Sequence, residues 1–290
     1  MSKTLSDLIA DAIASLTGAG VPSPQADAWH LASHLLGRGR GELQARMIVG
    51  SIELDASQQE QFSALLARRV SREPLWHITG VAPFLDMDLR VGPGVFTPRP
   101  ETELLAQHAT DEALSLHPVE GTLRIVDVCS GSGALALAIG RALPHAEVLA
   151  IEISAEAEPF LRDNIAHYAP SVELVMGDIG ELASHEWAGS VDLIVSNPPY
   201  LRPDEPLDVE TQGFDPGIAL VSGDDGLDLI RRLIPLAHNT LRPGGVIVME
   251  HGVDQGESIR ELLGHAGFKN QTTVTDLVGR DRFSRAMKGA

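Results

Sequence analysis

The residues with the clearest chemistry are a polar tetrapeptide that ends an apolar run. "VDLIVS" occupies 191–196, and Asn197, Pro198, Pro199 and Tyr200 follow it. The β-branched run is typical of a buried strand. Asparagine accepts an N–H through its side-chain oxygen, and proline restricts both its own φ and the residue before it, so carbonyl directions are set in advance. A tight turn would explain the prolines, whereas a site that holds a planar nitrogen would explain all four residues.

A second candidate site is the glycine turn in "VDVCSGSG". Asp127 ends an apolar run here, and Gly131 and Gly133 follow it. Glycine lets the backbone adopt unusual dihedral angles and approach a ligand at the carboxyl ends of parallel strands. The turn does not match the dinucleotide pattern G-x-G-x-x-G, because Ala136 stands in place of the third glycine.

Two acids complete the pattern. Glu152 closes the run "VLAIE", about 20 residues after the glycine turn, where a carboxylate can accept the hydroxyls of a ribose. Asp178 follows "VELVMG" and could accept the exocyclic amine of adenine. Each acid alone fits an ordinary surface residue, but together they favour a nucleoside site. The absence of a pyrophosphate-type loop favours S-adenosylmethionine over NAD as the ligand that carries this nucleoside.

From residue 98 onward, apolar strand-like runs alternate with amphipathic helical stretches. This alternation predicts an α/β domain with a mostly parallel sheet, helices on both faces and right-handed crossovers. The last run, "RFSRAMK", alternates polar and apolar residues and is predicted to add a late edge strand.

The first part of the chain has a different pattern. Residues 1–75 show helical spacing, and 76–97 are predicted to form a β-hairpin linker from short pieces such as "LWHITG", which begins just before it, and "MDLRVGPGVF". Several arginines in the helical part either form a basic face for an acidic partner or lie singly on helix surfaces, and we favour the second interpretation. These are Arg38, Arg40, Arg46, Arg68, Arg69 and Arg72.

Composition limits the function. The chain of 290 residues has one cysteine, Cys129, which excludes a disulfide framework and a cysteine zinc cluster within the chain. A net charge of −18 opposes attraction to nucleic acid and anionic lipid. Asp7 and Asp11 interrupt the apolar pattern of the first residues, which argues against a signal-peptide core. No apolar run is long enough to span a bilayer. We therefore expect a cytoplasmic protein that binds no DNA, membrane or metal.

"NPPY" at a strand end resembles the motif of S-adenosylmethionine-dependent methyltransferases that act on planar nitrogens. A longer set of stretches resembles the protein-glutamine methyltransferases of the PrmC (HemK) type, in the same order along most of the chain. These are "REPLWHITG", "GVFTPRPETELL", "VDVCSGSGALALAIG", "VSNPPY", "GFDPGIAL", "GDDGLD" and "EHGVDQGE".

The resemblance implies a class I, Rossmann-like S-adenosylmethionine-dependent methyltransferase domain over 98–290, preceded by a small all-α substrate-recognition domain over 1–75 and the hairpin linker. It implies methyl transfer to the side-chain amide nitrogen of the glutamine in the Gly-Gly-Gln loop of class I peptide-chain release factors. The donor leaves as S-adenosylhomocysteine, and we expect the enzyme to be a monomer.

The resemblance also implies roles for single residues. The catalytic and substrate-holding segment is Asn197, Pro198, Pro199 and Tyr200. The cofactor contacts fall on Cys129, Ser130, Gly131, Ser132, Gly133, Glu152, Asp178, Ile179 and Asn197.

Two of these positions depart from the family pattern. Cys129 stands where the family often has glycine, so we expect no positive φ there. Ile179 replaces an aromatic residue of some members, so its contact with adenine would be aliphatic. Phe96 and Arg99 are expected to border the cofactor pocket, whereas His251 receives no catalytic role because packing explains it equally well.

Three alternatives stay open at this point. A nucleic-acid adenine N6 methyltransferase would use "NPPY" equally well, but the acidic charge disfavours it. A ribosomal-protein glutamine methyltransferase resembles "FTPRPETELL" only in part. A non-catalytic S-adenosylmethionine-binding adaptor is disfavoured because Asn197, Glu152 and Gly131 are all present.

Overall fold

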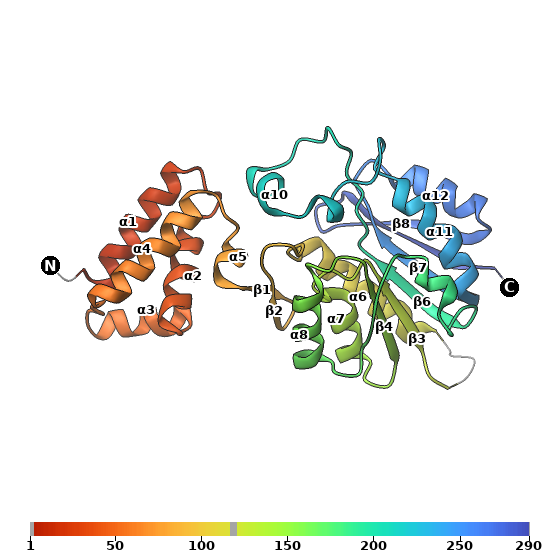
Figure 1. The fold of residues 1–290 in the computed structure, drawn as a ribbon, viewed down its shortest axis with the longest axis horizontal. Coiled ribbons are helices and arrows are strands. Elements are labelled where there is room, and N and C mark those ends of the chain that lie inside the picture. Colours follow the sequence, from red (N-terminus) through yellow and green to blue (C-terminus); the bar gives the residue numbers. More distant parts are fainter. Residues whose placement is uncertain (1–2, 117–120, 290) are drawn as a thin grey trace. The chain divides into compact units, whose positions relative to one another are not determined.

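A computed structural model describes residues 3–116 and 121–289, which divide into two compact units (Figure 1). The first unit contains Met1–Val81 together with a later segment, Leu207–Phe214. The second contains Ala82–Pro206 and Asp215–Ala290. The chain therefore leaves the second unit shortly after Tyr200 and returns to it at Asp215.

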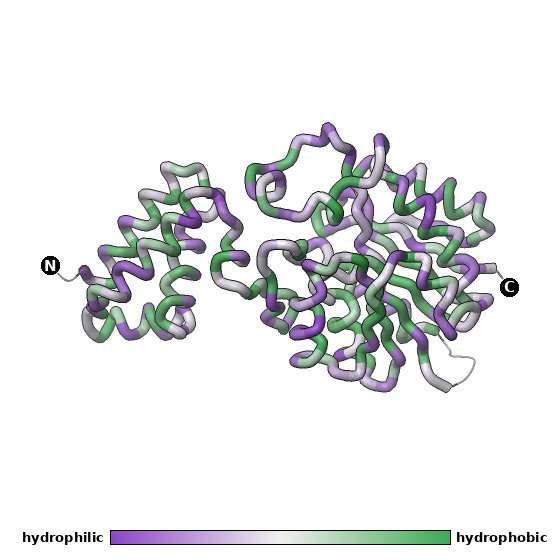
Figure 2. The backbone as a smooth tube through the Cα atoms, viewed as in Figure 1, coloured by the Kyte–Doolittle hydropathy of each residue, from purple (hydrophilic) through white to green (hydrophobic). Residues whose placement is uncertain are grey.

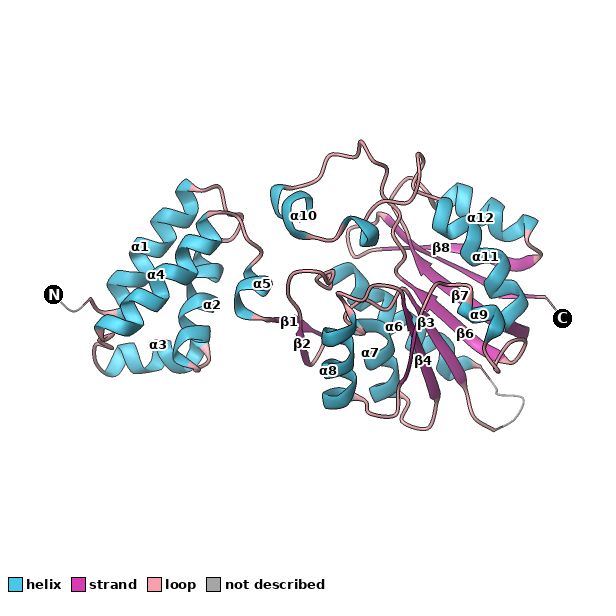
Figure 3. Ribbon diagram, viewed as in Figure 1, coloured by secondary structure: helices cyan, strands magenta, loops and turns pink. Residues whose placement is uncertain are grey.

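The first unit is built from helices (Figure 3). A capping box starts α1, where Thr4 Oγ1 accepts the N–H of Asp7 at 3.2 Å, and a second capping box starts α4, where Asp55 caps Gln58. The apolar faces of the helices between residues 5 and 79 share a core. The helices are α1 (Leu5–Gly18), α2 (Pro24–Leu36), α3 (Arg40–Val49), α4 (Ala56–Val70), α5 (Leu75–Thr79) and α10 (Val209–Phe214).

A buried ion-pair network fastens α10 to the rest of this unit. Arg69 Nε lies 2.7 Å from Asp27 Oδ2, and its Nη2 lies 2.8 Å from Glu210 Oε1. Arg72 Nη2 reaches the same Glu210 oxygen at 2.9 Å. Arg69 is only 3% exposed. Both interpretations are therefore wrong for Arg69: it does not lie on a helix surface, and it adds no charge to a basic face because its charge is neutralised inside the unit.

The second unit contains a sheet of seven strands in the order β5-β4-β3-β6-β7-β9-β8. The first five strands of this order are parallel, and β9 pairs antiparallel with both β7 and β8. The strands are β3 (Arg124–Val128), β4 (Glu147–Glu152), β5 (Glu173–Met176), β6 (Val191–Ser196), β7 (Leu241–Glu250), β8 (Phe268–Thr275) and β9 (Asp281–Lys288). A separate two-stranded sheet is formed by β1 (Val81–Phe84) and β2 (Met87–Arg90).

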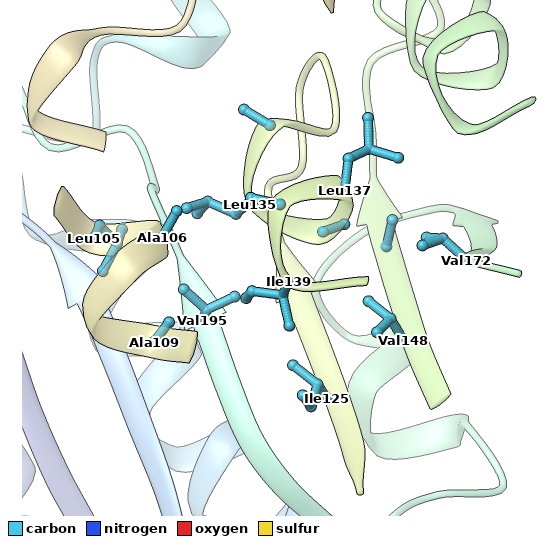
Figure 4. Packing of buried hydrophobic residues seen from close by; sticks show 14 of the residues in the cluster. Leu105, Ala106, Ala109, Ile125, Leu135, Leu137, Ile139, Val148, Val172 and Val195 are labelled. Atoms are coloured by element: carbon cyan, nitrogen blue, oxygen red, sulfur yellow. The ribbon is translucent and has the colours of Figure 1, made fainter. Parts of the chain in front are cut away.

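Helices cover both faces of the large sheet, as the alternation of patterns predicts. One core cluster joins α6 (Pro100–Ser115), α7 (Ala134–Ala142) and α8 (Glu158–Tyr168) to one face. Figure 4 shows Leu135 and Ile139 of α7 beside Val195 of β6. The second core cluster joins α9 (Glu181–Ser184), α11 (Asp228–Thr240) and α12 (Gly256–His265) to the opposite face. A short 3₁₀ helix, η1, covers Gly217–Ala219.

The strands in the middle of the sheet are buried on both faces. All six residues of β6 are buried, and Figure 2 shows mainly hydrophobic colouring where the strands of the large sheet lie. Each fully buried Val, Leu or Ile side chain stabilises the fold by about 1.5–3 kcal/mol. The sheet is therefore a rigid support for the loops at its carboxyl edge.

The fold class is confirmed, with two local corrections. "LWHITG" was expected as a β-like piece, but it forms α5, with Gly80 as a left-handed C-cap. "RFSRAMK" was expected at an edge, but β9 lies inside the sheet between β7 and β8. The strand at this edge of the sheet is β8, of which only Phe268 is buried, and the sequence does not predict it because its polar composition hides the strand pattern.

None of the helices in the described ranges combines the length and hydropathy that a bilayer span requires.

Candidate functional site

The carboxyl ends of β3 and β6 lie side by side where the strand order reverses. Val128 pairs with Ser196 in the parallel register, and Ser196 Oγ donates to the carbonyl oxygen of Val128 at 2.7 Å. In open α/β sheets the ligand crevice forms at such a reversal. The glycine turn after β3 and the "NPPY" segment after β6 therefore start at neighbouring points of the same edge.

The turn after β3 has three residues with positive φ: Cys129 at 63°, Gly131 at 55° and Gly133 at 88°. The expectation that Cys129 avoids positive φ is therefore wrong. Cys129 adopts the left-handed conformation directly after β3, between Val128 and Ser130, whose N–H still donates to the carbonyl of Ile151 in β4 at 3.1 Å. Burial raises the pKa of the Cys129 thiol, so it stays protonated and inert.

The two glycines of the turn have different surroundings. A Cβ on Gly133 would lie 2.7 Å from Leu161 Cδ1, so Gly133 is required for packing between α7 and α8. A Cβ on Gly131 would meet no atom within 4 Å. Gly131 therefore faces open space, and its N–H donates to Glu152 Oε2 at 2.7 Å.

We expect different effects from alanine at these two positions. Gly133→Ala should lower the free energy of unfolding by about 2–4 kcal/mol, because it adds both a clash and strain at positive φ. Gly131→Ala should cost only about 1–2 kcal/mol, but it should weaken nucleoside binding because the new methyl fills the open space. Urea denaturation and calorimetric titration measure the two effects, and equal losses of stability would contradict this distinction.

Glu152 is buried, and both of its oxygens accept backbone N–H groups. Oε2 accepts from Gly131, and Oε1 accepts from Ser154 at 2.7 Å. A carboxylate has about four acceptor positions, so each oxygen keeps one for a further donor such as a ribose hydroxyl.

Asp178 is more exposed and is held by neighbours. Its Oδ1 accepts from Gly180 N–H at 3.0 Å and pairs with Arg232 Nη2 at 2.7 Å. The adjacent Ile179 is buried against the α9–α12 side of the sheet. An adenine amine would have to share the Asp178 carboxylate with Arg232.

Asp127 is a buried carboxylate whose chemistry the sequence did not reveal. Its Oδ2 accepts from Ala136 N–H at 3.1 Å, while Oδ1 has no hydrogen-bond partner among the described residues. Burial raises the pKa of Asp127 to about 7. An unpaired buried carboxylate oxygen costs stability unless a ligand donates to it, so Asp127 Oδ1 is a candidate acceptor for a ligand N–H group or a cation.

The acceptor motif is held by a polar network behind it. Asn197 Nδ2 donates to Thr102 Oγ1 at 3.2 Å, and Thr102 Oγ1 donates to Glu250 Oε2 at 3.0 Å. Tyr200 Oη donates to Glu250 Oε1 at 3.1 Å. Burial and the neighbouring Glu250 raise the pKa of Tyr200, so its hydroxyl stays neutral. One carboxylate at the end of β7 therefore fixes both ends of the motif.

The backbone of the motif is also held. Gln255 Nε2 donates to the Tyr200 carbonyl at 2.9 Å, and a Cβ on Gly226 would lie only 2.2 Å from the same oxygen. The carbonyls of Pro198 and Pro199 accept no hydrogen bond within the ranges that the structure describes. The carbonyls available to a ligand are therefore those of the prolines and not that of Tyr200.

Phe96, Arg99 and His251 have clear local contacts. Arg99 lies 5.2 Å from the centre of the Phe96 ring, and its Nη2 pairs with Asp215 Oδ2 at 2.6 Å. His251 Nε2 lies 2.9 Å from Ser284 Oγ, and burial lowers the pKa of this histidine. These contacts favour a packing role for His251, while a pocket wall at Phe96 and Arg99 stays a prediction.

The sequence did not reveal the roles of Thr102, Glu250 and Gln255. All three lie within stretches that carry the family resemblance, "GVFTPRPETELL" and "EHGVDQGE". Their function depends on contacts with residues 50 to 148 positions away, which no local pattern encodes.

Comparisons with known proteins agree with this geometry. The family described as "PrmC N-terminal domain" matches residues 7–80, and the "Methyltransferase small domain" family matches 87–211. A release factor glutamine methyltransferase of Corynebacterium glutamicum is 42% identical, over 98% of this chain and 99% of its own length. One from Streptomyces coelicolor is 44% identical, over 97% of this chain and 96% of its own.

Solved structures share the fold. A methyltransferase from Pyrococcus furiosus aligns over 79% of this chain and all of its own, with a TM-score of 0.50 and 19% identity. A T. thermophilus 16S rRNA methyltransferase, solved with its methyl donor, covers 72% of this chain and 49% of its own, with a TM-score of 0.51 and 23% identity. The near full-length relatives go further than the fold: this chain is an S-adenosylmethionine-dependent methyltransferase, and it belongs to the release factor glutamine methyltransferase family.

Proposed function

We propose that the chain methylates the side-chain amide nitrogen (N5) of the glutamine in the Gly-Gly-Gln loop of class I peptide-chain release factors. The observation that carries this proposal is the fixed Asn197, whose amide nitrogen is bound to Thr102 and whose oxygen is left for a substrate N–H. The near full-length relatives named for this reaction support the choice of substrate.

The residues around the glycine turn fit S-adenosylmethionine. We assign to its binding Cys129 through Gly133, together with Glu152, Asp178, Ile179 and Asn197. The open space at Gly131, the spare acceptor positions of Glu152 and the unpaired oxygen of Asp127 match a ribose and a cationic amino-acid group. When bound, the donor supplies an electrophilic methyl group and leaves as S-adenosylhomocysteine.

Asn197, Pro198, Pro199 and Tyr200 hold the acceptor. An amide nitrogen is a weak nucleophile because its lone pair is delocalised into the carbonyl. Asn197 Oδ1 accepts one N–H of the substrate amide, and a proline carbonyl accepts the other, so the nitrogen is oriented for attack. Tyr200 lies against the flat face of the amide. Such orientation contributes up to about 7–11 kcal/mol of barrier reduction in favourable systems.

The proton balance requires no dedicated base. As the nitrogen–carbon bond forms and the carbon–sulfur bond breaks, the amide nitrogen becomes acidic and releases one proton to solvent. This agrees with the contacts of His251, which bonds to Ser284 and the Gly252 carbonyl.

The helical unit fits a role in substrate recognition, within the proposed division into 1–75, 76–97 and 98–290. The acidic net charge opposes binding to DNA or anionic membranes. We propose that the enzyme acts as a monomer in the cytoplasm, where its release-factor substrate would be found.

Intact-mass measurement tests the function directly. Unmethylated release factor incubated with the enzyme and S-adenosylmethionine should gain the mass of one methyl group. A factor with the glutamine of the Gly-Gly-Gln loop replaced by asparagine should gain none. No gain on a factor known to be unmethylated would refute the proposal, and methylation of RNA in place of the factor would favour the nucleic-acid alternative.

A further inference from the structure

The polar network behind the acceptor motif has a single direction when the Glu250 carboxylate is ionised. Thr102 and Glu250 are 3% and 2% exposed, so no solvent competes for their hydrogen bonds. They come from distant elements, the first turn of α6 and the end of β7, and both meet the segment after β6. The network links Asn197 through Thr102 to Glu250, and Tyr200 directly to Glu250.

The direction follows from counting protons. An ionised carboxylate only accepts hydrogen bonds, and a threonine hydroxyl has one proton to donate. Because Thr102 gives its proton to Glu250, its oxygen can only accept from Asn197. Asn197 must then turn its NH₂ group toward Thr102, which turns its oxygen Oδ1 away from the network.

This polarity matters because a substrate amide presents N–H donors. A reversed chain would have Glu250 protonated and donating to Thr102, with Thr102 donating to Asn197 Oδ1. Asn197 would then offer an N–H group toward the N–H groups of the substrate, and no hydrogen bond could form. Both hydrogen-bond arrangements satisfy the buried groups equally well. Only the first leaves Asn197 Oδ1 available to accept an N–H group of the substrate.

We propose that Glu250 and Thr102 are positioning residues that keep the Asn197 amide oriented as a hydrogen-bond acceptor for the substrate nitrogen. The proposal rests on the function proposed above and deepens it. Neither residue touches the reacting atoms. Glu250 also holds the Tyr200 hydroxyl, so the same carboxylate fixes the ring beside the substrate amide.

Shape-conserving variants test this proposal in the full-length enzyme. Thr102→Val removes the acceptor for Asn197. Glu250→Gln replaces one of the two carboxylate oxygens by an NH₂ group, so one oxygen remains for the Thr102 and Tyr200 hydroxyls and the new NH₂ group can donate to Thr102. Each should lower kcat by about 100-fold, as expected for a misoriented reacting group, while the Kd for S-adenosylmethionine stays within about twofold of the wild-type value. Thr102→Ser keeps the hydroxyl and should restore kcat to within a few-fold.

Matched controls come from the same helix. Thr110 Oγ1 donates to the Ala106 carbonyl, and Glu112 pairs with Arg285 at 2.9 Å, both away from the acceptor motif. Thr110→Val and Glu112→Gln make the same chemical changes as the test variants. Both should keep wild-type kcat, and a loss equal to that of the test variants would overturn the proposal.

The pH profile gives a readout that simple packing would not produce. Burial raises the pKa of Glu250 to about 7. The hydrogen bonds from Thr102 and Tyr200 and the charge of Arg282 on β9 lower this pKa, whereas the charge of Glu101 on α6 raises it. Below this pH the carboxyl gains a proton, which permits the reversed chain. The wild-type kcat should fall about tenfold for each pH unit below 7.

In Glu250→Gln, kcat should no longer fall as the pH drops below 7. The variant keeps Arg282, Glu101 and the neighbouring His251, so any dependence due to those groups would persist. If kcat of Glu250→Gln falls below pH 7 as it does in the wild type, the proposed role of Glu250 is contradicted.

A measurement on the free enzyme separates this inference from the proposed function. In ¹⁵N-edited NMR spectra, the Asn197 side-chain amide protons should exchange slowly with water in the wild type and rapidly in Thr102→Val. If the wild type fails to methylate a release factor, the proposed function is wrong, and the NMR result still decides the orientation of Asn197. Rapid exchange in the wild type, or wild-type kcat in both test variants, would overturn the proposal.

Discussion

Asn197→Ala should lower kcat for release-factor methylation by about 10³-fold, equivalent to about 4 kcal/mol of transition-state stabilisation. The variant removes the side-chain oxygen that accepts the substrate N–H. The amide group of the substrate glutamine is then free to rotate. The strand that supports it is unchanged, because all six residues of β6 are buried independently of this side chain. Single-turnover kinetics with saturating S-adenosylmethionine measure the loss.

Binding of the methyl donor should largely persist in Asn197→Ala, with a Kd within about threefold by calorimetry. Most of the assigned donor contacts lie on the glycine turn, Glu152 and the Asp178–Ile179 pair. Asn239→Ala is a suitable control, since Asn239 is exposed on α11. Wild-type turnover in Asn197→Ala would refute the acceptor role, and a parallel loss of donor binding would show that Asn197 acts through the donor.

Arg69→Met should lower the free energy of unfolding of the helical unit by about 3–5 kcal/mol. The substitution keeps much of the side-chain volume but removes the charge between Asp27 and Glu210. Asp27 is buried, so its carboxylate would lose the partner that compensates for its desolvation. Urea denaturation followed by circular dichroism, together with limited proteolysis, reports on this unit.

The neighbouring Arg68→Met serves as a matched control. Arg68 pairs with Glu73, but its side chain is 44% exposed, so its loss should cost less than about 1 kcal/mol. Combining Arg69→Met with Asp27→Leu should recover most of the stability, because the uncompensated charge is then removed too. Equal effects of the two arginine substitutions would show that the buried network adds nothing beyond a surface pair.

The alternation of strand and helix patterns was sufficient to predict the α/β class, because strands buried on both faces leave long apolar runs such as "VDLIV". The same reasoning failed at "LWHITG", where a short helix ends at Gly80. It also failed at β8, because an edge strand exposes polar side chains and gives no apolar run. Periodicity reports burial, so elements with little burial are the ones it misses.

For the site, the sequence predicts which residues lie at strand ends, but it does not predict the contacts between them. The positions of Gly131, Glu152 and Asn197 follow from the ends of three parallel strands. The partnership of Asn197 with Thr102, 95 positions away, depends on how α6 packs on the sheet. The positive φ of Cys129 was predicted wrongly because residue type alone does not reveal the bend that the turn imposes.

The membership of α10 in the helical unit sets an order of events during synthesis. Arg69 and its partner Glu210 are separated by 141 positions in the chain. A ribosome adds roughly 5–20 residues per second, so Glu210 is made about 7–28 s after Arg69. Until then Arg69 has Asp27 as a partner, but the nascent helical bundle lacks its last helix. The amino-terminal unit therefore reaches its final form only after the ribosome has passed the "NPPY" segment.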